Sequence, residues 1–157
     1  MTVEIHDGTR WQPVCSLDDL QPGRGVAVLL PPADTQVALF LDRSGALYAV
    51  DNRDPFSGAH VLSRGLLGSR AGRPTLASPM YKQTFDLTDG RCLDEDTAPD
   101  GTPAVLRRWP VRAAATDARN PRSPRNPGNP ENSRNSRNSR NSRNSRNSRN
   151  SRKEERA

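Results

Sequence analysis

Every aromatic side chain of this 157-residue chain precedes residue 110, and this uneven distribution most constrains what the chain can fold into. Residues 116–157 contain no aromatic residue and no Leu, Ile or Val. A segment of that composition cannot bury enough apolar surface to offset the entropy lost on ordering. The sequence therefore predicts one folded domain over residues 1–115 and a disordered tail over residues 116–157.

The tail carries the basic character of the chain. After an Asn- and Pro-rich stretch it reads Asn-Ser-Arg seven times, from Asn132 to Arg152. Residues 1–115 hold 12 Lys and Arg against 14 Asp and Glu, a formal charge of −2, whereas the tail holds 12 against 4, or +8. The arginines would attract phosphate, but a tail without aromatic residues offers no stacking platform. Solvated disorder is the favoured interpretation, and nucleic-acid binding through the tail is an alternative.

The folded part shows short apolar runs between turn signals, which is typical of an all-β domain. We expect strands at residues 11–15, 25–30, 36–41 and 104–111, with Pro110 at an edge or at the end of the last one. Two hairpins are expected, at residues 40–50 and at residues 84–93, the second with a two-residue turn at Asp89-Gly90. One helical turn follows Ser16, which is suited to cap it together with Asp19. The glycine-containing residues 60–80 are interpreted as a loop.

The cysteines and histidines do not indicate a metal site. Cys15 and Cys92 lie among apolar residues without a Cys-x-x-Cys pair, so we expect buried thiols rather than a disulfide. His6 and His60 have no further ligand at a suitable spacing, and no zinc site is expected. The first residues do not resemble a signal peptide, and the longest apolar run is too short to span a bilayer, so a cytoplasmic location is expected.

In each of two loops a short polar residue precedes a proline. The first loop, residues 52–58, contains Asp54-Pro55-Phe56. The second loop, residues 77–83, contains Ser78-Pro79-Met80-Tyr81. They resemble the loops of Rieske-type domains, in which Cys-Pro-His and Cys-Pro-x-His hold a [2Fe-2S] cluster. Here the four ligand positions are occupied by Asp54, Phe56, Ser78 and Tyr81. Phe has no donor atom, and the oxygen donors are too hard for such a cluster. The resemblance therefore implies a Rieske-like sandwich or barrel of short antiparallel strands that binds no cluster.

A more particular resemblance covers residues 11–112 and rests on the strings DPFSGAHVLSRG and SPMYKQTFDLTDGRCL. These are similar to the small subunit of assimilatory NAD(P)H-dependent nitrite reductase, which implies an accessory subunit in the six-electron reduction of nitrite to ammonium. The partner would be the large catalytic subunit, which carries FAD, sirohaem and a [4Fe-4S] cluster in that family. This chain would hold no cofactor and perform no chemistry, in keeping with its lack of an acid/base pair or an activated nucleophile. A freestanding Rieske-type electron carrier is an alternative, and it would require iron.

The two loops also suggest how the fold would be held without a cluster and where a partner would dock. We expect the rings of Phe56 and Tyr81 to touch edge to face, with centroids within about 7 Å. Asp54 would accept a hydrogen bond from Ser78 or from loop amides. The residues predicted to dock on the large subunit are Phe56, Ser57, Arg64, Tyr81, Lys82 and Gln83. Interior packing is the competing explanation for Phe56 and Tyr81.

Overall fold

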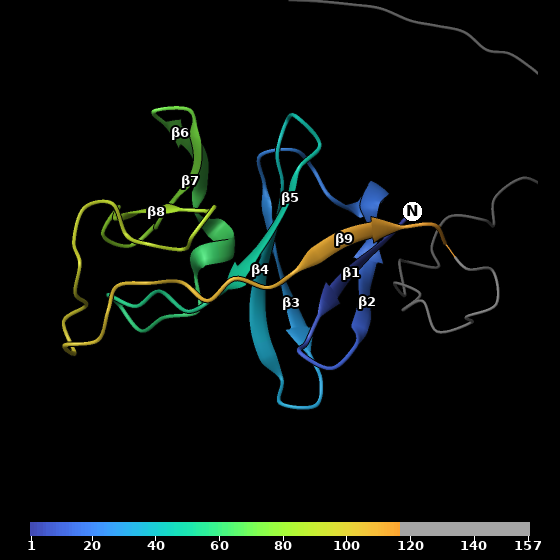
Figure 1. Ribbon diagram of the computed structural model, residues 1–157, viewed down its shortest axis with the longest axis horizontal. Coiled ribbons are helices and arrows are strands. Elements are labelled where there is room, and N and C mark those ends of the chain that lie inside the picture. Colours follow the sequence, from blue (N-terminus) through green and yellow to red (C-terminus); the bar gives the residue numbers. More distant parts are fainter. Residues whose placement is uncertain (117–157) are drawn as a thin grey trace, which may run out of the picture. The chain divides into compact units, whose positions relative to one another are not determined.

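The computed structural model describes residues 1–116, which form three three-stranded antiparallel sheets (Figure 1). This confirms the predicted all-β class. The predicted disordered tail falls on residues 117–157, which lie outside the described residues. No helix in the described part of the chain is long and apolar enough to cross a membrane.

The first sheet has the order β2-β1-β9, with β1 at Thr2–His6, β2 at Trp11–Ser16 and β9 at Val111–Ala114. Strand β1 was not predicted, although Val3 and Ile5 alternate with polar residues and both are fully buried. The predicted helical turn is confirmed as the 3-10 helix η1 at Leu17–Asp19. Ser16 caps it in a capping box with Asp19.

The second sheet has the order β3-β4-β5, with β3 at Gly25–Leu30, β4 at Thr35–Leu41 and β5 at Leu47–Asp51. The predicted hairpin between β4 and β5 is confirmed. Its turn is held by Asp42, whose carboxylate accepts the N–H groups of Ser44 and Ala46, and Gly45 adopts a φ of 90°.

The third sheet has the order β6-β7-β8, with β6 at Leu66–Arg70, β7 at Arg73–Ala77 and β8 at Thr84–Asp86. Residues 60–80 are therefore not the predicted loop. They hold the 3-10 helix η2 at Leu62–Arg64 and a hairpin whose turn, Ala71-Gly72, has positive φ at both positions, as a tight hairpin turn requires.

The turn after β8 is wider than predicted. The backbone N–H of Asp86 donates to the carbonyl oxygen of Arg91, so residues 87–90 form the turn rather than Asp89-Gly90 alone. Gly90 adopts a φ of 83° there, and a Cβ at that position would lie 2.2 Å from the carbonyl oxygen of Leu106. The turn therefore requires glycine both for its backbone conformation and for the close approach of residue 106.

The last strand lies further along the chain than predicted, at Val111–Ala114 instead of residues 104–111. Strand β9 begins at Val111, directly after Pro110, while the preceding residues run beside β5 through an isolated bridge between Val50 and Arg108. Trp109 is buried, and its indole N–H donates to Asp51 at 2.8 Å. Because Pro110 has no N–H to donate, the regular ladder starts only beyond it.

The core lies on both faces of β4, which explains the unbroken apolar run of that strand. Val37 and Leu39 belong to the cluster shared with β1, whereas Ala38 and Phe40 belong to the cluster shared with the third sheet and its loops. All four side chains are fully buried. Figure 1 shows the β3-β4-β5 sheet between the other two sheets.

Both cysteines are free thiols, as predicted, but only Cys92 is buried as expected. Cys92 belongs to the core cluster beneath the third sheet. Cys15 is half-buried, and desolvation, followed by the nearby charge of Asp19, raises the pKa of its thiol to about 11. At neutral pH this thiol is protonated, which makes it a poor nucleophile.

Candidate functional site

The first loop leaves β5 and is closed on itself by Asp54, which is fully buried. The backbone N–H of Asp54 donates to the carbonyl oxygen of Ala59 at 2.9 Å, and the N–H of Gly58 donates back to the carbonyl oxygen of Asp54 at 2.8 Å. Asp54 Oδ1 also accepts the N–H of Phe56 at 2.8 Å. Pro55 fixes the φ angle at the centre of this turn, so little freedom remains in the loop.

The second loop connects β7 to β8 and is pinned by Ser78, which is also buried. The N–H of Ser78 donates to the carbonyl oxygen of Gln83 at 2.9 Å, and its hydroxyl accepts the N–H of Met80 at 3.2 Å. Lys82 adopts a φ of 65°, the left-handed conformation that only a minority of non-glycine residues occupy. The loop thus holds a defined shape while its tip is exposed.

A single hydrogen bond joins the two loops. Ser78 Oγ donates to Asp54 Oδ2 at 2.5 Å, and both side chains are buried. The structure therefore confirms that Asp54 accepts from Ser78 and from loop amides together. Both residues occupy positions that correspond to cysteine ligands in the Rieske pattern, so a side-chain contact links the loops where a cluster would link them.

The expected contact between the rings of Phe56 and Tyr81 is wrong. Phe56 lies beside Phe85 of β8, with ring centroids 6.2 Å apart and an interplanar angle of 53°. Tyr81 is 62% exposed and belongs to neither of the two ring pairs formed within residues 1–116. Interior packing is therefore the correct explanation for Phe56 and not for Tyr81. The ring of Phe56 pins the first loop to the core cluster beneath the third sheet.

The other residues predicted to dock are divided between surface and interior. Arg64 ends η2 and is exposed, as is Lys82. Ser57 is half-buried and its hydroxyl accepts the N–H of Ala59 at 3.3 Å, so it serves the first loop itself. Gln83 is half-buried, and its side-chain amide donates to Glu95 at 3.3 Å. Arg64, Lys82 and Tyr81 are thus the members of the predicted set that a partner could reach.

Asn52 contributes to the site and was missed in the sequence. Its side chain is buried, accepts the N–H of Ser63 at 2.7 Å and donates to the side-chain oxygen of Gln36 at 3.1 Å. Its carbonyl oxygen accepts the N–H of Leu62 at 3.1 Å. Asn52 thereby ties the start of the first loop to β4 and η2. An isolated Asn after a strand carries no signal that distinguishes this role from an ordinary turn.

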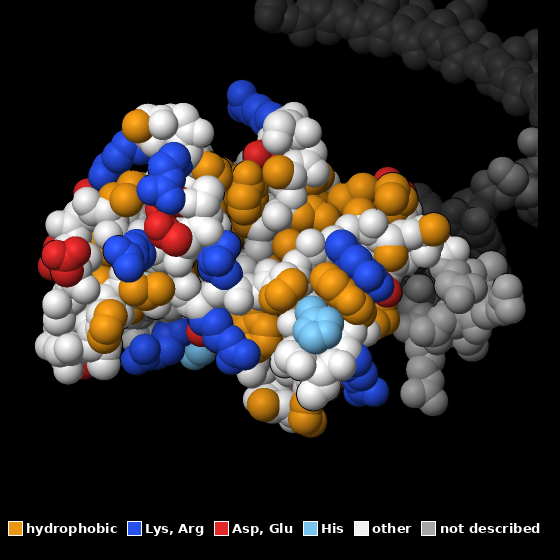
Figure 2. Space-filling view, in the orientation of Figure 1, with side chains coloured by type: hydrophobic (Ala, Val, Ile, Leu, Met, Phe, Trp, Pro, Cys, Tyr) orange, Lys and Arg blue, Asp and Glu red, His pale blue; other side chains and the backbone are white. Residues whose placement is uncertain are grey.

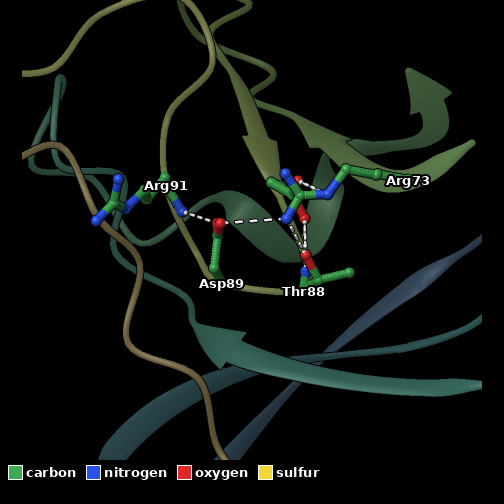
Figure 3. A network of polar contacts seen from close by, with 5 residues as sticks. Arg73, Thr88, Asp89 and Arg91 are labelled. Atoms are coloured by element: carbon green, nitrogen blue, oxygen red, sulfur yellow. Dashed lines mark hydrogen bonds and ion pairs between the residues drawn. The ribbon is translucent and has the colours of Figure 1, made fainter. Parts of the chain in front are cut away.

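A second polar network, also missed in the sequence, lies around Arg73 on the third sheet (Figure 3). Arg73 Nε lies 2.8 Å from Oδ2 of the buried Asp86, and Arg73 Nη2 lies 3.2 Å from Asp89 and 2.6 Å from the hydroxyl of Thr88. Among residues 1–116 Asp86 Oδ2 has no hydrogen-bond partner, so the ion pair with Arg73 is the contact that compensates its charge. The backbone N–H of Arg91, with Arg73 as a further cause, lowers the pKa of Asp89.

Comparison with known proteins places this arrangement in a family. Residues 10–118 match the model of the Rieske-like [2Fe-2S] domain. The chain is 43% identical over 89 residues to the nitrite reductase (NADH) small subunit of Salmonella typhimurium, covering 56% of this chain and 81% of that protein. The chain belongs to the Rieske-like [2Fe-2S] domain family, among the nitrite reductase small subunits. The resemblance noted in the sequence is thereby confirmed.

Two further relatives extend this family assignment. The solution structure of the nitrite reductase [NAD(P)H] small subunit from Erwinia carotovora is 33% identical, with a TM-score of 0.50, covering 76% of this chain and 93% of that one. The large subunit of nitrite reductase [NAD(P)H] from Klebsiella oxytoca is 44% identical over 103 residues, which are 65% of this chain. That match spans only 10% of the large subunit, so a domain like this one forms a small part of that longer protein.

The residues of this chain do not fit the [2Fe-2S] cluster that gives the family its name. Phe56 supplies no donor atom, and the oxygens of Asp54 and Ser78 are already engaged with each other and with loop amides. Within residues 1–116 no group of three or more His, Cys, Asp or Glu side chains could hold a metal ion. A cluster of this kind requires two thiolates and two imidazoles, and none of the four positions provides either.

Proposed function

We propose that this chain is the accessory small subunit of an NAD(P)H-dependent nitrite reductase and supports the six-electron reduction of nitrite to ammonium in the cytoplasm. The observation that carries the proposal is its membership among the nitrite reductase small subunits, combined with loops that are closed by the bond between Ser78 and Asp54. This chain supplies a rigid docking module, and its partner supplies the redox groups, which we take to be FAD, sirohaem and a [4Fe-4S] cluster.

The chemistry of the loops supports a role without catalysis in this chain. Asp54 is the one carboxylate in the first loop, and both of its oxygens accept hydrogen bonds within the fold. A general acid or base must reach a substrate proton, which a fully buried carboxylate in a closed loop cannot do. Asp54 therefore serves the structure of the loops, and docking is the role that we propose for their exposed residues.

The Klebsiella oxytoca large subunit supports the identity of the partner. In that protein a domain 44% identical to this chain is part of the large-subunit polypeptide itself. Covalent linkage gives such a domain a high effective concentration at the surface that it contacts. A separate chain with the same fold must obtain the same contact through affinity, and we propose that Arg64, Tyr81 and Lys82 contribute to it.

Reconstitution tests this function. The full chain would be mixed with the large subunit of the same organism, and nitrite-dependent NAD(P)H oxidation and co-elution in size-exclusion chromatography would be measured. We expect a stable complex with higher activity than the large subunit alone, and iron in the isolated small chain far below one atom per chain. Separate elution and unchanged activity would contradict the proposal. Two iron atoms per isolated chain would instead identify a freestanding electron carrier.

A further inference from the structure

Exposed apolar side chains lie on the outer face of the third sheet and in the segments beside it. Leu67, Leu76 and Phe85 lie opposite one another across β6, β7 and β8 and face the core. Because side chains alternate along a strand, the neighbouring row points to the other face. That row is Leu66, Ala77 and Thr84.

This row continues into the adjacent segments. The N–H of Leu93 donates to the carbonyl oxygen of Thr84 at 2.7 Å, which places Leu93 at the far end of the row. Four of the eight exposed large apolar side chains in the described part belong to this sheet and the segments beside it. They are Leu66 at 74%, Met80 at 49%, Tyr81 at 62% and Leu93 at 38% exposed, and we call them the β6–β8 patch.

The charges on this face are already paired within the sheet. Arg70 lies 3.2 Å from Asp94, and Arg73 contacts Asp86 and Asp89 (Figure 3). Figure 2 shows basic and acidic side chains interspersed over this part of the molecule. Burying charges that keep their partners costs less than burying isolated ones, and apolar centres with Tyr, Met and Arg are typical of protein interfaces. This combination favours a protein surface over a small anion or a nucleic acid.

Two cations at the border of the patch remain without an ion pair among the described residues, Arg64 beside β6 and Lys82 at the tip of the second loop. Lys82 is held in the left-handed conformation, which fixes the direction of this tip although it is exposed. A partner that covers the patch should therefore present an apolar surface bordered by carboxylates.

We propose that the β6–β8 patch, bordered by Arg64 and Lys82, is the surface that docks on the large nitrite reductase subunit. This inference rests on the proposed function and specifies its interface. The large subunit is the occupant because a domain like this one is built into such a subunit in Klebsiella oxytoca. The proposed interface adds residues of the third sheet to the predicted docking set. It leaves out Phe56, Ser57 and Gln83, which support the loops.

Mutagenesis with a matched control tests the patch. Leu66→Glu and Tyr81→Ala in the full chain should each weaken binding to the large subunit about tenfold or more, measured by isothermal titration calorimetry. Leu29→Glu on β3 changes another exposed Leu, which is 59% exposed, and should alter affinity less than about twofold. All three positions are exposed enough that the fold should be retained, which circular dichroism would verify.

Hydrogen exchange maps the same contact without substitutions. On adding the large subunit, peptides over residues 62–70 and 77–85 should gain protection, whereas a peptide over residues 25–30 should not. Unchanged affinity for Leu66→Glu and Tyr81→Ala, with protection elsewhere, would overturn the patch and leave the accessory role intact. A dimer of the isolated chain that Leu66→Glu dissociates would assign the patch to self-association. Failure of the wild-type chain to bind would contradict the accessory role itself.

Discussion

Replacing Ser78 with Ala should show how strongly one hydrogen bond holds the two loops together. The variant leaves Asp54 Oδ2 buried without its donor, which lies at 2.5 Å in the wild type. A hydrogen bond to a carboxylate contributes about 1.5–3 kcal/mol, and an unsatisfied buried acceptor costs a similar amount. We therefore expect Ser78→Ala to lower the free energy of unfolding by about 2 kcal/mol, or the Tm by roughly 8 °C for a domain of this size.

The matched control is Ser44→Ala in the turn between β4 and β5. Ser44 Oγ donates to Asp42 Oδ1 at 2.6 Å, so the chemistry is the same, but this pair is exposed to solvent. Water replaces the lost donor there, and the cost should stay within about 0.5 kcal/mol. The two sites thus differ in burial rather than in the kind of bond.

Urea unfolding of both variants, followed by circular dichroism, provides the measurement. A double-mutant cycle with Asp54→Ala isolates the contribution of the pair and should give a coupling of more than about 1 kcal/mol. Asp54→Ala alone should be the costliest change, because the amide of Phe56 also loses its acceptor. A cost for Ser78→Ala no greater than that for Ser44→Ala would show that the buried bond does not hold the loops together.

Two further predictions concern the third sheet and its turns. Gly90→Ala should cost about 3 kcal/mol or more in urea unfolding, because it combines a φ of 83° with a Cβ 2.2 Å from the carbonyl oxygen of Leu106. Gly45→Ala, with a φ of 90° but open space, should cost only about 1 kcal/mol. The pKa of Asp94 is lowered from 3.8, chiefly by the N–H of Thr84, so its stabilisation is present above pH 3.8 and is lost as the pH falls through the lower folded-state value. The Tm of the Asp94→Asn variant should therefore fall less between pH 5 and pH 2 than the Tm of the wild type. An equal fall would contradict a stabilising role of the Asp94 carboxylate.

The parts of the fold that the sequence predicted are those governed by local signals. The apolar run of β4 predicts a strand, and Gly45 marks the hairpin that follows. Strand β1 was missed because its apolar alternation is limited to Val3 and Ile5, a weak strand signal, although one of its two partners, β2, follows directly in the sequence. The hairpin of β6 and β7 was missed because its turn, Ala71-Gly72, lacks the Asn or Asp that usually marks such a turn.

The same distinction applies to the candidate site. The two prolines located both loops. Asp54, before the first proline, was expected to accept a hydrogen bond from Ser78, before the second, or from loop amides, and it accepts both. The aromatic partner of Phe56 could not be predicted, because it depends on which face of β8 points inward. The register with β7 turns Phe85 toward the core, while the tip of the second loop leaves Tyr81 in solvent.

The structure also indicates why a pair of loops can keep its shape without a cluster. Four metal–ligand bonds would hold the loops rigidly. Here three weaker effects stabilise the loops instead. Pro55 restricts the unfolded chain, the ring of Phe56 packs on the core, and the carboxylate of Asp54 binds Ser78. Each contributes a few kcal/mol at most, comparable in sum to the net stability of a small domain. Because these contacts lie on the inner side of the loops, the tip around Tyr81 is left free to contact another protein.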